Sequence, residues 1–234
     1  MKKIILSLLS IALFSAYSFG QTADEIIEKN TKAMGGIEKL KSINSVVMEG
    51  KVNAQGMEIP IKMIIVKNIG SKVEFSVMGM NAWTIMRPDS GWMFMPFQGQ
   101  TKPEAMPADA IKEGTDMLDL EGELVNYKEK GHSIEYLGMD DVEGTECHKL
   151  KIITKNGNVH YELIDPKSFL TVRKIAINKS GGKEMEIQTD LSNYKEVEGG
   201  FMFPFTVSSM GGPMEMTKIL INSPVDNSAF RPTN

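Results

Sequence analysis

Residues 57–77 read MEIPIKMIIVKNIGSKVEFSV, two runs of alternating side chains joined by the turn-type residues NIG. Every second residue from Met57 to Ile65 is apolar, and the alternation returns from Val73 to Val77. A period of two places these side chains on one face of a strand, so each run is predicted to be a half-buried β-strand. Because the connection is short, the two strands are predicted to be antiparallel neighbours.

The same alternation recurs along most of the chain. It predicts strands at residues 45–53, 57–67, 72–79, 82–88, 91–97, 132–143, 145–155, 158–165, 168–178, 183–195, 201–210 and 214–222, separated by turn residues. The tail, residues 223–234, is polar and contains proline, and no strand is predicted there.

Few segments have helical spacing. A capping box, Thr22-Ala23-Asp24-Glu25, opens one helix that Gly35-Gly36 ends, a short helical piece follows at residues 37–42, and a weaker stripe occupies residues 108–120. Helices about 10 Å wide cover so broad a sheet only if the sheet curls around them. The fold is therefore predicted to be mainly β (α+β), a strongly curved antiparallel sheet forming an incomplete barrel with two or three helices covering its concave face.

Asn156-Gly157 predicts a hairpin with a two-residue type I′ turn. Ile152 would then pair with Tyr161. Leu150 would pair with Leu163, and these pairs would form one apolar face. The opposite face would be mostly polar.

The same register bears on catalysis and metal binding. It places His148 and His160 on opposite faces, where they cannot share an ion, and no ligand-spacing motif accompanies them. Cys147 is flanked by His148, but adjacent strand residues point to opposite faces, so a packing cysteine is predicted. Ser90 lies outside any nucleophile elbow. Neither an enzyme, nor a cofactor, nor a metal site is predicted.

The beginning of the chain predicts export. Lys2 and Lys3 precede an apolar run that ends at a small-residue site, the pattern of a secretory signal peptide at residues 1–20. Cleavage is predicted after Gly20, where no cysteine is available for a lipid anchor. Residues 21–234 are predicted to form a single periplasmic domain. No later segment approaches the roughly 20 apolar residues that a membrane-spanning helix needs.

Charge limits the partners. The formal net charge is -4, and removal of residues 1–20 takes away two lysines and no acid, which gives -6. Nucleic acid is therefore not an expected partner, because phosphate binding needs a basic surface. A monomer is expected.

Methionine is unusually common. The chain has 18, most of them in predicted strands. An unbranched, polarizable side chain can repack around ligands of different shape, so a methionine-rich wall favours an adaptable binding cavity. Ordinary core packing is the alternative for each residue. Residues 98–130 break the strand pattern, and residues 98–120, which contain prolines and Gly114, are the candidate for a movable cover.

Several short motifs occur in order along the chain: Ala33-Met34-Gly35-Gly36 before Glu38-Lys39-Leu40, Asp89-Ser90-Gly91-Trp92-Met93-Phe94-Met95-Pro96, Gly144-Thr145-Glu146-Cys147-His148-Lys149-Leu150, and Ile164-Asp165-Pro166. With the export signal, they resemble the bacterial outer-membrane lipoprotein-sorting family, the LolA- and LolB-type carriers. The resemblance covers nearly the whole mature chain. It implies an incomplete barrel closed by helices around a cavity for lipoprotein acyl chains.

Two departures limit what the resemblance implies. The family's early-strand Arg-Pro dipeptide, whose arginine helps to hold the lid, is absent from residues 57–67, and Arg87-Pro88 lies later in the chain. The protruding apolar loop and lipid anchor of the receptor-type member are also missing. No lid-locking arginine is therefore assigned.

The resulting functional prediction is a periplasmic carrier that binds acyl chains of lipoproteins or other lipids for delivery to the outer membrane, with donor and acceptor proteins at the two membranes. The predicted lipid-binding residues are Met48, Met57, Ile61, Met63, Ile65, Phe75, Val77, Trp83, Ile85, Trp92, Phe94, Leu150, Ile152, Tyr161 and Leu163. The predicted lid residues are Met106, Ile111, Gly114, Met117 and Leu118. An envelope sensor or regulator, or a structural module with a solid interior, is the alternative.

Overall fold

The computed structural model describes residues 22–54, 56–180 and 183–232. Its strands are β1 (Ser45–Ala54), β2 (Met57–Val66), β3 (Gly70–Val77), β4 (Met80–Met86), β5 (Gly91–Phe94), β6 (Glu104–Ala105), β7 (Ser133–Val142), β8 (Thr145–Ile153), β9 (Val159–Ile164), β10 (Thr171–Ser180), β11 (Lys183–Val197), β12 (Phe201–Ser209) and β13 (Gly212–Ile221). The predicted signal peptide and its cleavage after Gly20 lie outside the described residues.

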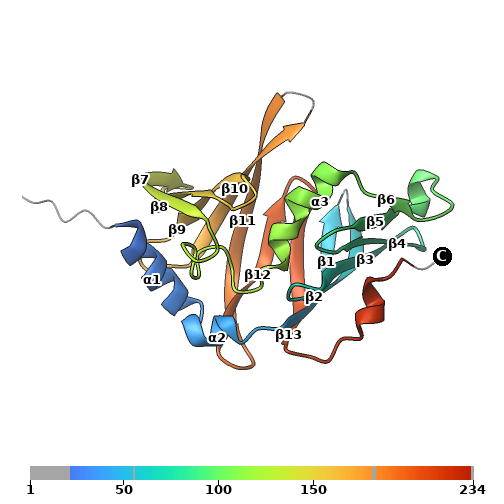
Figure 1. Cartoon of the computed structure of the whole chain (residues 1–234), viewed down its shortest axis with the longest axis horizontal. Helices are drawn as coiled ribbons and strands as arrows, with labels where there is room; N and C mark the ends of the chain where they lie inside the picture. The colour runs from blue at the N-terminus through green and yellow to red at the C-terminus, as the bar shows by residue number, and fades with distance from the viewer. Residues whose placement is uncertain (1–21, 55, 181–182, 233–234) are drawn as a thin grey trace, which may run out of the picture.

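All of these strands belong to one antiparallel sheet. Their order is β6-β5-β4-β3-β2-β1-β13-β12-β11-β10-β9-β8-β7, so the edge strands β6 and β7 do not meet and the sheet stays open. Figure 1 shows how it curls around the helices. The predicted incomplete barrel is confirmed. Only β6, two residues long, was not predicted, because its length leaves no alternation to detect.

The helices are α1 (Ala23–Ala33), α2 (Ile37–Lys41) and α3 (Ala108–Gly114), with three-ten turns η1 (Pro96–Gln98), η2 (Thr115–Leu118) and η3 (Asn227–Phe230). The predicted capping box is present, since Thr22 and Glu25 each accept a backbone hydrogen bond of 3.2 Å from the other. The weak stripe at 108–120 divides into α3 and η2. No helix within the described ranges is long and apolar enough to cross a membrane.

The three α-helices lie on one side of the sheet, which we call the covered face; the other side is the outer face (Figure 1). Ile26 and Ile27 of α1 pack on Leu150 and Ile152 of β8, and all four are buried. Full burial of one such side chain contributes about 1.5–3 kcal/mol. The helix is therefore held mainly by its apolar face.

A β-bulge bends the sheet at its centre. The pairing of β1 with β13 shifts between Glu49 and Gly50. A Cβ atom on Gly50 would lie 2.4 Å from the carbonyl oxygen of Glu215, so only glycine fits this close approach. Because bulges increase local bending and twist, this one helps β1 and β13 join the two halves of the curled sheet.

Apolar clusters lie on both faces. On the covered face, one cluster forms under α1, and a second under α2 contains Leu40, Val46 and Phe201. A third cluster lies on the outer face, where Phe230 of η3 packs with Trp83 and Ile85 of β4. The tail is thus part of the packed structure, although its polar sequence predicted no regular element.

The predicted register of the β8–β9 hairpin is wrong by one residue. Ile153 pairs with Val159, and the turn closes with Thr154 N donating to Asn158 O at 2.9 Å. The loop is a three-residue turn with Gly157 at a φ of 84°. One residue of slip moves every side chain of a strand to the other face.

The slip changes which side chains share a face. Leu150 now pairs with Glu162 and Ile152 with His160, whereas Tyr161 and Leu163 project from the outer face. His160 and His148 therefore lie on the same face, contrary to the prediction. His148 pairs with Ile164, four residues along β9 from His160, so the two histidines are still about 13 Å apart.

Candidate functional site

The covered face contains cavities around residues 121–131, which we call the inner loop. The helix cavity, of about 460 Å³, lies between α1 and this loop. The central cavity, of about 310 Å³, lies between α1, the loop and β9–β12. The hairpin cavity, of about 400 Å³, lies beyond the loop, between η2 and β9–β11. Leu124 and Val125 line the first two, and Glu123 lines the last two, so the inner loop is the common wall.

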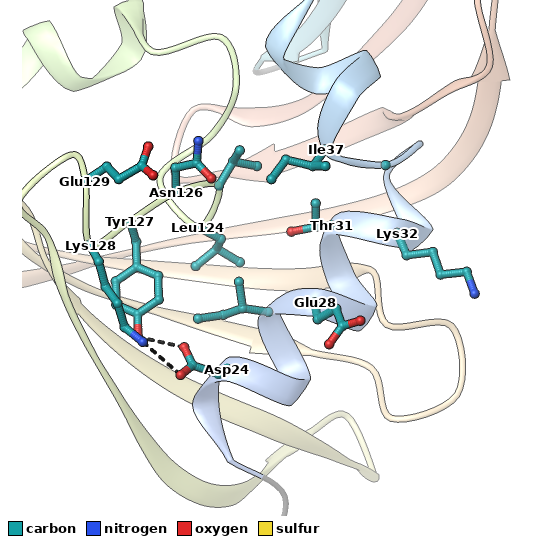
Figure 2. Close-up of a pocket in the computed structure, with 13 residues that line it drawn as sticks. Asp24, Glu28, Thr31, Lys32, Ile37, Leu124, Asn126, Tyr127, Lys128 and Glu129 are labelled. Carbon is teal, nitrogen blue, oxygen red and sulfur yellow. Dashed lines mark hydrogen bonds and ion pairs between the residues drawn. The ribbon is translucent and has the colours of Figure 1, made fainter.

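The helix cavity has apolar walls and a charged rim. Leu124, Val125 and Ile27 contribute its apolar surface together with Ile37, which is 39% exposed. Figure 2 shows Asp24 of α1 linked across the rim to the inner loop. An opening between two such elements suits an amphipathic ligand, whose chain is buried while its polar end stays in water.

Asp24 joins α1 to the inner loop. Its carboxylate accepts a hydrogen bond of 2.8 Å from Tyr127 Oη and lies 2.9 Å from Lys128 Nζ. The Lys128 ammonium and the Tyr127 hydroxyl hold the pKa of Asp24 below its usual value. The pair is largely exposed to solvent, so it contributes little to stability and can break readily.

The central cavity is apolar at one end and polar at the other. Its apolar lining residues are Met34, Leu40, Leu124, Val125, Leu191, Phe203 and Pro204. At the polar end, Glu162 accepts from Thr171 Oγ1 at 2.9 Å and lies 2.7 Å from Lys174 Nζ. Burial alone would raise the pKa of Glu162, but the Lys174 ammonium keeps the pKa below its usual value. Glu162 is therefore ionised at neutral pH.

The hairpin cavity lies beside a hydrogen-bonded anchor. Asp116 of η2 accepts from Thr154 at 3.1 Å, from Asn156 at 2.9 Å and from Asn158 at 2.7 Å. These donors belong to the β8–β9 turn, whereas η2 lies in residues 98–120, which follow β5 in the chain. Asp116 thus ties residues 98–120, the lid segment, to the opposite half of the sheet.

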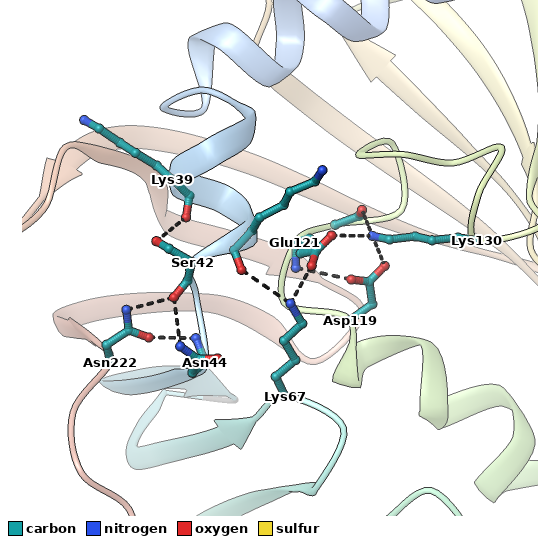
Figure 3. Close-up of polar contacts among 10 residues, drawn as sticks. Lys39, Ser42, Asn44, Lys67, Asp119, Glu121, Lys130 and Asn222 are labelled. Carbon is teal, nitrogen blue, oxygen red and sulfur yellow. Dashed lines mark hydrogen bonds and ion pairs between the residues drawn. The ribbon is translucent and has the colours of Figure 1, made fainter.

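The inner loop is held by a small ion-pair network (Figure 3). Glu121 contacts Lys67 of the β2–β3 turn, and Lys130 lies 2.6 Å from Asp119 and 3.5 Å from Glu121. Burial would raise the pKa of Glu121, but Lys67 and Lys130 lower it overall. The network therefore adds charged contacts to the packing of Leu124 and Val125, which hold the same loop in the apolar clusters.

The lid segment packs on the covered face of β3–β5. The backbone of Met106 donates to Gly91 at 2.8 Å, and the Met106 and Ile111 side chains come close to the same glycine. Gly114 lies against Met86, and Met117 lies 3.3 Å from Ser71 Oγ. Leu118 is buried. The predicted lid residues are therefore together on one face, with Met117 43% exposed.

The predicted lining residues are divided between the two faces of the sheet. The covered face holds Met48, Met57, Ile61, Met63, Ile65, Phe75, Val77, Leu150 and Ile152. The outer face holds Trp83, Ile85, Trp92, Phe94, Tyr161 and Leu163, because their strands pair in the alternate register. None of these residues lines the helix, central or hairpin cavity.

The lining of these cavities comes mostly from the inner loop, α1 and β9–β12. Leu124 and Val125 are adjacent in a non-repetitive segment, so no periodicity predicts that both are buried. Phe203 belongs to the alternating run Phe201, Phe203 and Phe205, and such alternation is typical of a strand with one apolar face.

Two further cavities lie on the outer face. One of about 460 Å³ lies under the C-terminal tail, and another of about 540 Å³ crosses β1–β4. Charged side chains, among them Glu49 and Lys62, line both.

Several solved structures have this fold. A DUF1329 family protein from Desulfovibrio piger aligns over 91% of this chain and 98% of its own, with a TM-score of 0.59 and 11% identity. An outer-membrane lipoprotein-sorting protein domain, so described, from Vibrio parahaemolyticus aligns over 88% and 95%, with a TM-score of 0.55 and 13% identity. A LolA superfamily protein from Nitrosomonas europaea aligns over 91% and 99%, with a TM-score of 0.56 and 13% identity.

Sequence comparison adds no relative. No protein-family model matches the chain, and no curated protein is similar to it in sequence. The likeness in structure nevertheless covers nearly all of each chain. The chain has the LolA-like fold that the resemblance predicted.

Proposed function

We propose that the protein is a periplasmic carrier, not an enzyme, that binds acyl chains of lipoproteins or other lipids and delivers them to the outer membrane. The observation that carries the proposal is a set of neighbouring cavities of about 310–460 Å³ that share the inner loop as a wall. A structural module with a solid interior would not need them. The LolA-like fold supports the same conclusion.

Binding of this kind needs no polar anchor. Each buried methylene contributes about 0.8 kcal/mol, so about eight methylenes would contribute about 6 kcal/mol before the cost of association. Release then depends on the covering elements. The exposed Asp24–Lys128 pair, which joins α1 to the inner loop, is a contact that can break at little cost in free energy.

A titration with a fluorescent fatty acid tests the proposal. The delipidated protein is expected to take up the probe saturably. Ile37→Glu should weaken uptake about tenfold or more, because it places a carboxylate in the apolar wall of the helix cavity, and desolvation of a polar group there costs about 1–3 kcal/mol or more.

Leu137→Glu is the matched control, since Leu137 is 44% exposed on β7 and lines none of the covered-face cavities. Both variants should melt near the wild-type temperature. Absence of saturable uptake by the wild-type protein, or equal loss in the two variants, would argue against the carrier.

A further inference from the structure

A cluster of metal-ligating side chains lies where the inner loop meets β9. His160 and Glu162 are two residues apart on one strand, so their side chains share the covered face. Glu123 approaches from the inner loop. One ligand atom from each of the three side chains lies within 4.8 Å of the other two. A strand and a loop that are distant in sequence thus supply one imidazole and two carboxylates to a single point.

The imidazole nitrogen at this point has no satisfactory partner. Among the described residues, His160 Nε2 is buried and makes no hydrogen bond, although it lies only 2.6 Å from Glu123 Oε2. The two atoms are close but are not aligned for donation. Their side chains are 12% and 16% exposed, so water compensates little. Here a buried ring nitrogen and a carboxylate oxygen face each other without a well-aligned hydrogen bond. A cation bound between them would accept electron pairs from both atoms.

The local charges favour a cation as well. Two carboxylates, Glu123 and Glu162, face one ammonium, that of Lys174, which lies 2.7 Å from Glu162 Oε1. Thr171 donates to the second oxygen of Glu162 at 2.9 Å. The Lys174 ammonium does not block access of a cation to Glu162, because the lysine side chain is 44% exposed and can turn toward solvent.

We propose that Glu123, His160 and Glu162 bind a divalent transition-metal ion of the Zn²⁺ type. One imidazole and two carboxylates match the nitrogen and oxygen ligands that Zn²⁺ takes, and three protein ligands leave a position that water can occupy from the hairpin cavity. The absence of a metal was predicted from the sequence because His160 was compared only with His148. The carboxylate partner, Glu123, comes from a loop whose position no pattern revealed.

The metal would fasten the inner loop to the sheet. Glu123 lies in the wall shared by the central and hairpin cavities, so a bound ion would fix that wall independently of any lipid. The proposal therefore does not rest on the carrier function. Metal binding without lipid uptake would refute only the carrier, and lipid uptake without metal binding would refute only this site.

Calorimetry with ZnCl₂ on the chelator-treated exported protein tests the site. One equivalent is expected to bind, and Co²⁺ should give the visible absorption of a nitrogen- and oxygen-ligated ion. Glu123→Gln and His160→Gln should each lower Zn²⁺ affinity by more than the roughly 10- to 100-fold that loss of an outer-shell partner costs. Hydrogen exchange of residues 121–127 should slow when Zn²⁺ is added.

The control variants carry the same types of substitution, Glu to Gln and His to Gln, at positions outside the proposed site. Glu135→Gln, on an exposed residue of β7, and His148→Gln, on β8, should leave Zn²⁺ affinity unchanged. Far-ultraviolet circular dichroism of the metal-free variants verifies folding. No Zn²⁺ binding, equal losses in the controls, or equal affinity for Mg²⁺ would overturn the site and leave a plain His160–Glu123 ion pair.

Discussion

Methionine side chains occupy two different environments in this protein. Met48 and Met63 pack against the apolar cluster under α2 on the covered face. Met78 and Met210, in contrast, are 80% and 72% exposed at hairpin ends. Strand parity predicts which face a methionine occupies, but not whether a hairpin extends beyond its cover. Met48 and Met63 line none of the covered-face cavities, so their environment is that of core residues, the alternative to the adaptable wall that the composition suggested.

At Gly50 the backbone of the neighbouring strand leaves no space for a side chain. Gly50→Ala is expected to destabilise the fold by about 1–3 kcal/mol, because the new Cβ would overlap the Glu215 carbonyl across the bulge. Urea unfolding measures the change. Gly211→Ala is the control, since nothing lies within 4 Å of a Cβ there, and it should stay within about 0.5 kcal/mol of wild type. Similar costs at both sites would show that the bulge can relax.

Glu121 should make the inner loop sensitive to acid. Its pKa is lowered in the folded protein, so its contribution to stability is present above the pKa of the unfolded chain and is lost as the pH falls through the lower, folded value. Glu121→Gln removes this contribution. The stability difference between wild type and variant should thus be largest near neutral pH and shrink toward zero in acid, as urea unfolding at several pH values can determine. A difference that stays constant with pH would contradict the assigned role of the Lys67 and Lys130 contacts.

At the scale of elements, turns limited what the sequence could predict. Asn156-Gly157 fits a two-residue turn with both residues at positive φ and equally fits a three-residue turn in which only Gly157 has positive φ. The structure has the second. The strands themselves were predicted within a few residues, but the single slip exchanged Tyr161 and Leu163 for Glu162 and His160 on the covered face.

The inner loop could not be predicted for a different reason. Residues 121–131 have neither a period of two nor one of 3.6, and their conformation depends on contacts with Lys67 and α1, which are distant in sequence. Because this loop forms the shared wall of the cavities, the candidate site was the least predictable part of the molecule. The capping box of α1, which depends on neighbouring residues alone, was predicted correctly.

The lid segment should loosen when its anchor is removed. Asp116→Ala deletes the acceptor for three donors of the β8–β9 turn, so faster amide exchange is expected in residues 115–118 and 154–158 but not in α1. The cost to global stability should be about 1–3 kcal/mol, since the three donors lose their partner. Hydrogen exchange followed by mass spectrometry resolves these segments.

Asp109→Ala provides the comparison for the anchor, because Asp109 is exposed on α3 of the same lid segment. Exchange in residues 115–118 should be unchanged in this variant. If both substitutions increased exchange to the same extent, the loss of a negative charge would explain the loosening, and the Asp116 anchor would not be what holds the lid segment.

For the whole molecule, the sequence predicted the curled sheet but not how it is covered on both sides. The argument from a broad sheet and few helices leads correctly to an open, curved sheet. It assigns all apolar strand residues to one interior, however, whereas Phe230 and the tail bury Trp83 and Ile85 on the outer face. Alternation reveals that a face is apolar; it does not reveal which segment covers that face.

A mutation on the outer face should therefore change the stability of the protein without changing lipid binding at the covered face. Phe230→Ala removes a fully buried side chain on the outer face and should destabilise the protein by about 3–5 kcal/mol. Fatty-acid affinity of the folded fraction should stay within about a factor of two, because distant sites couple by only about 0.3–0.5 kcal/mol. Phe230→Leu, which keeps most of the burial, guards against a variant that does not fold. If the leucine variant instead lost affinity and stability together, the acyl chain would bind in the outer-face cavity under the tail. The covered face would then be a packed support and not the binding site.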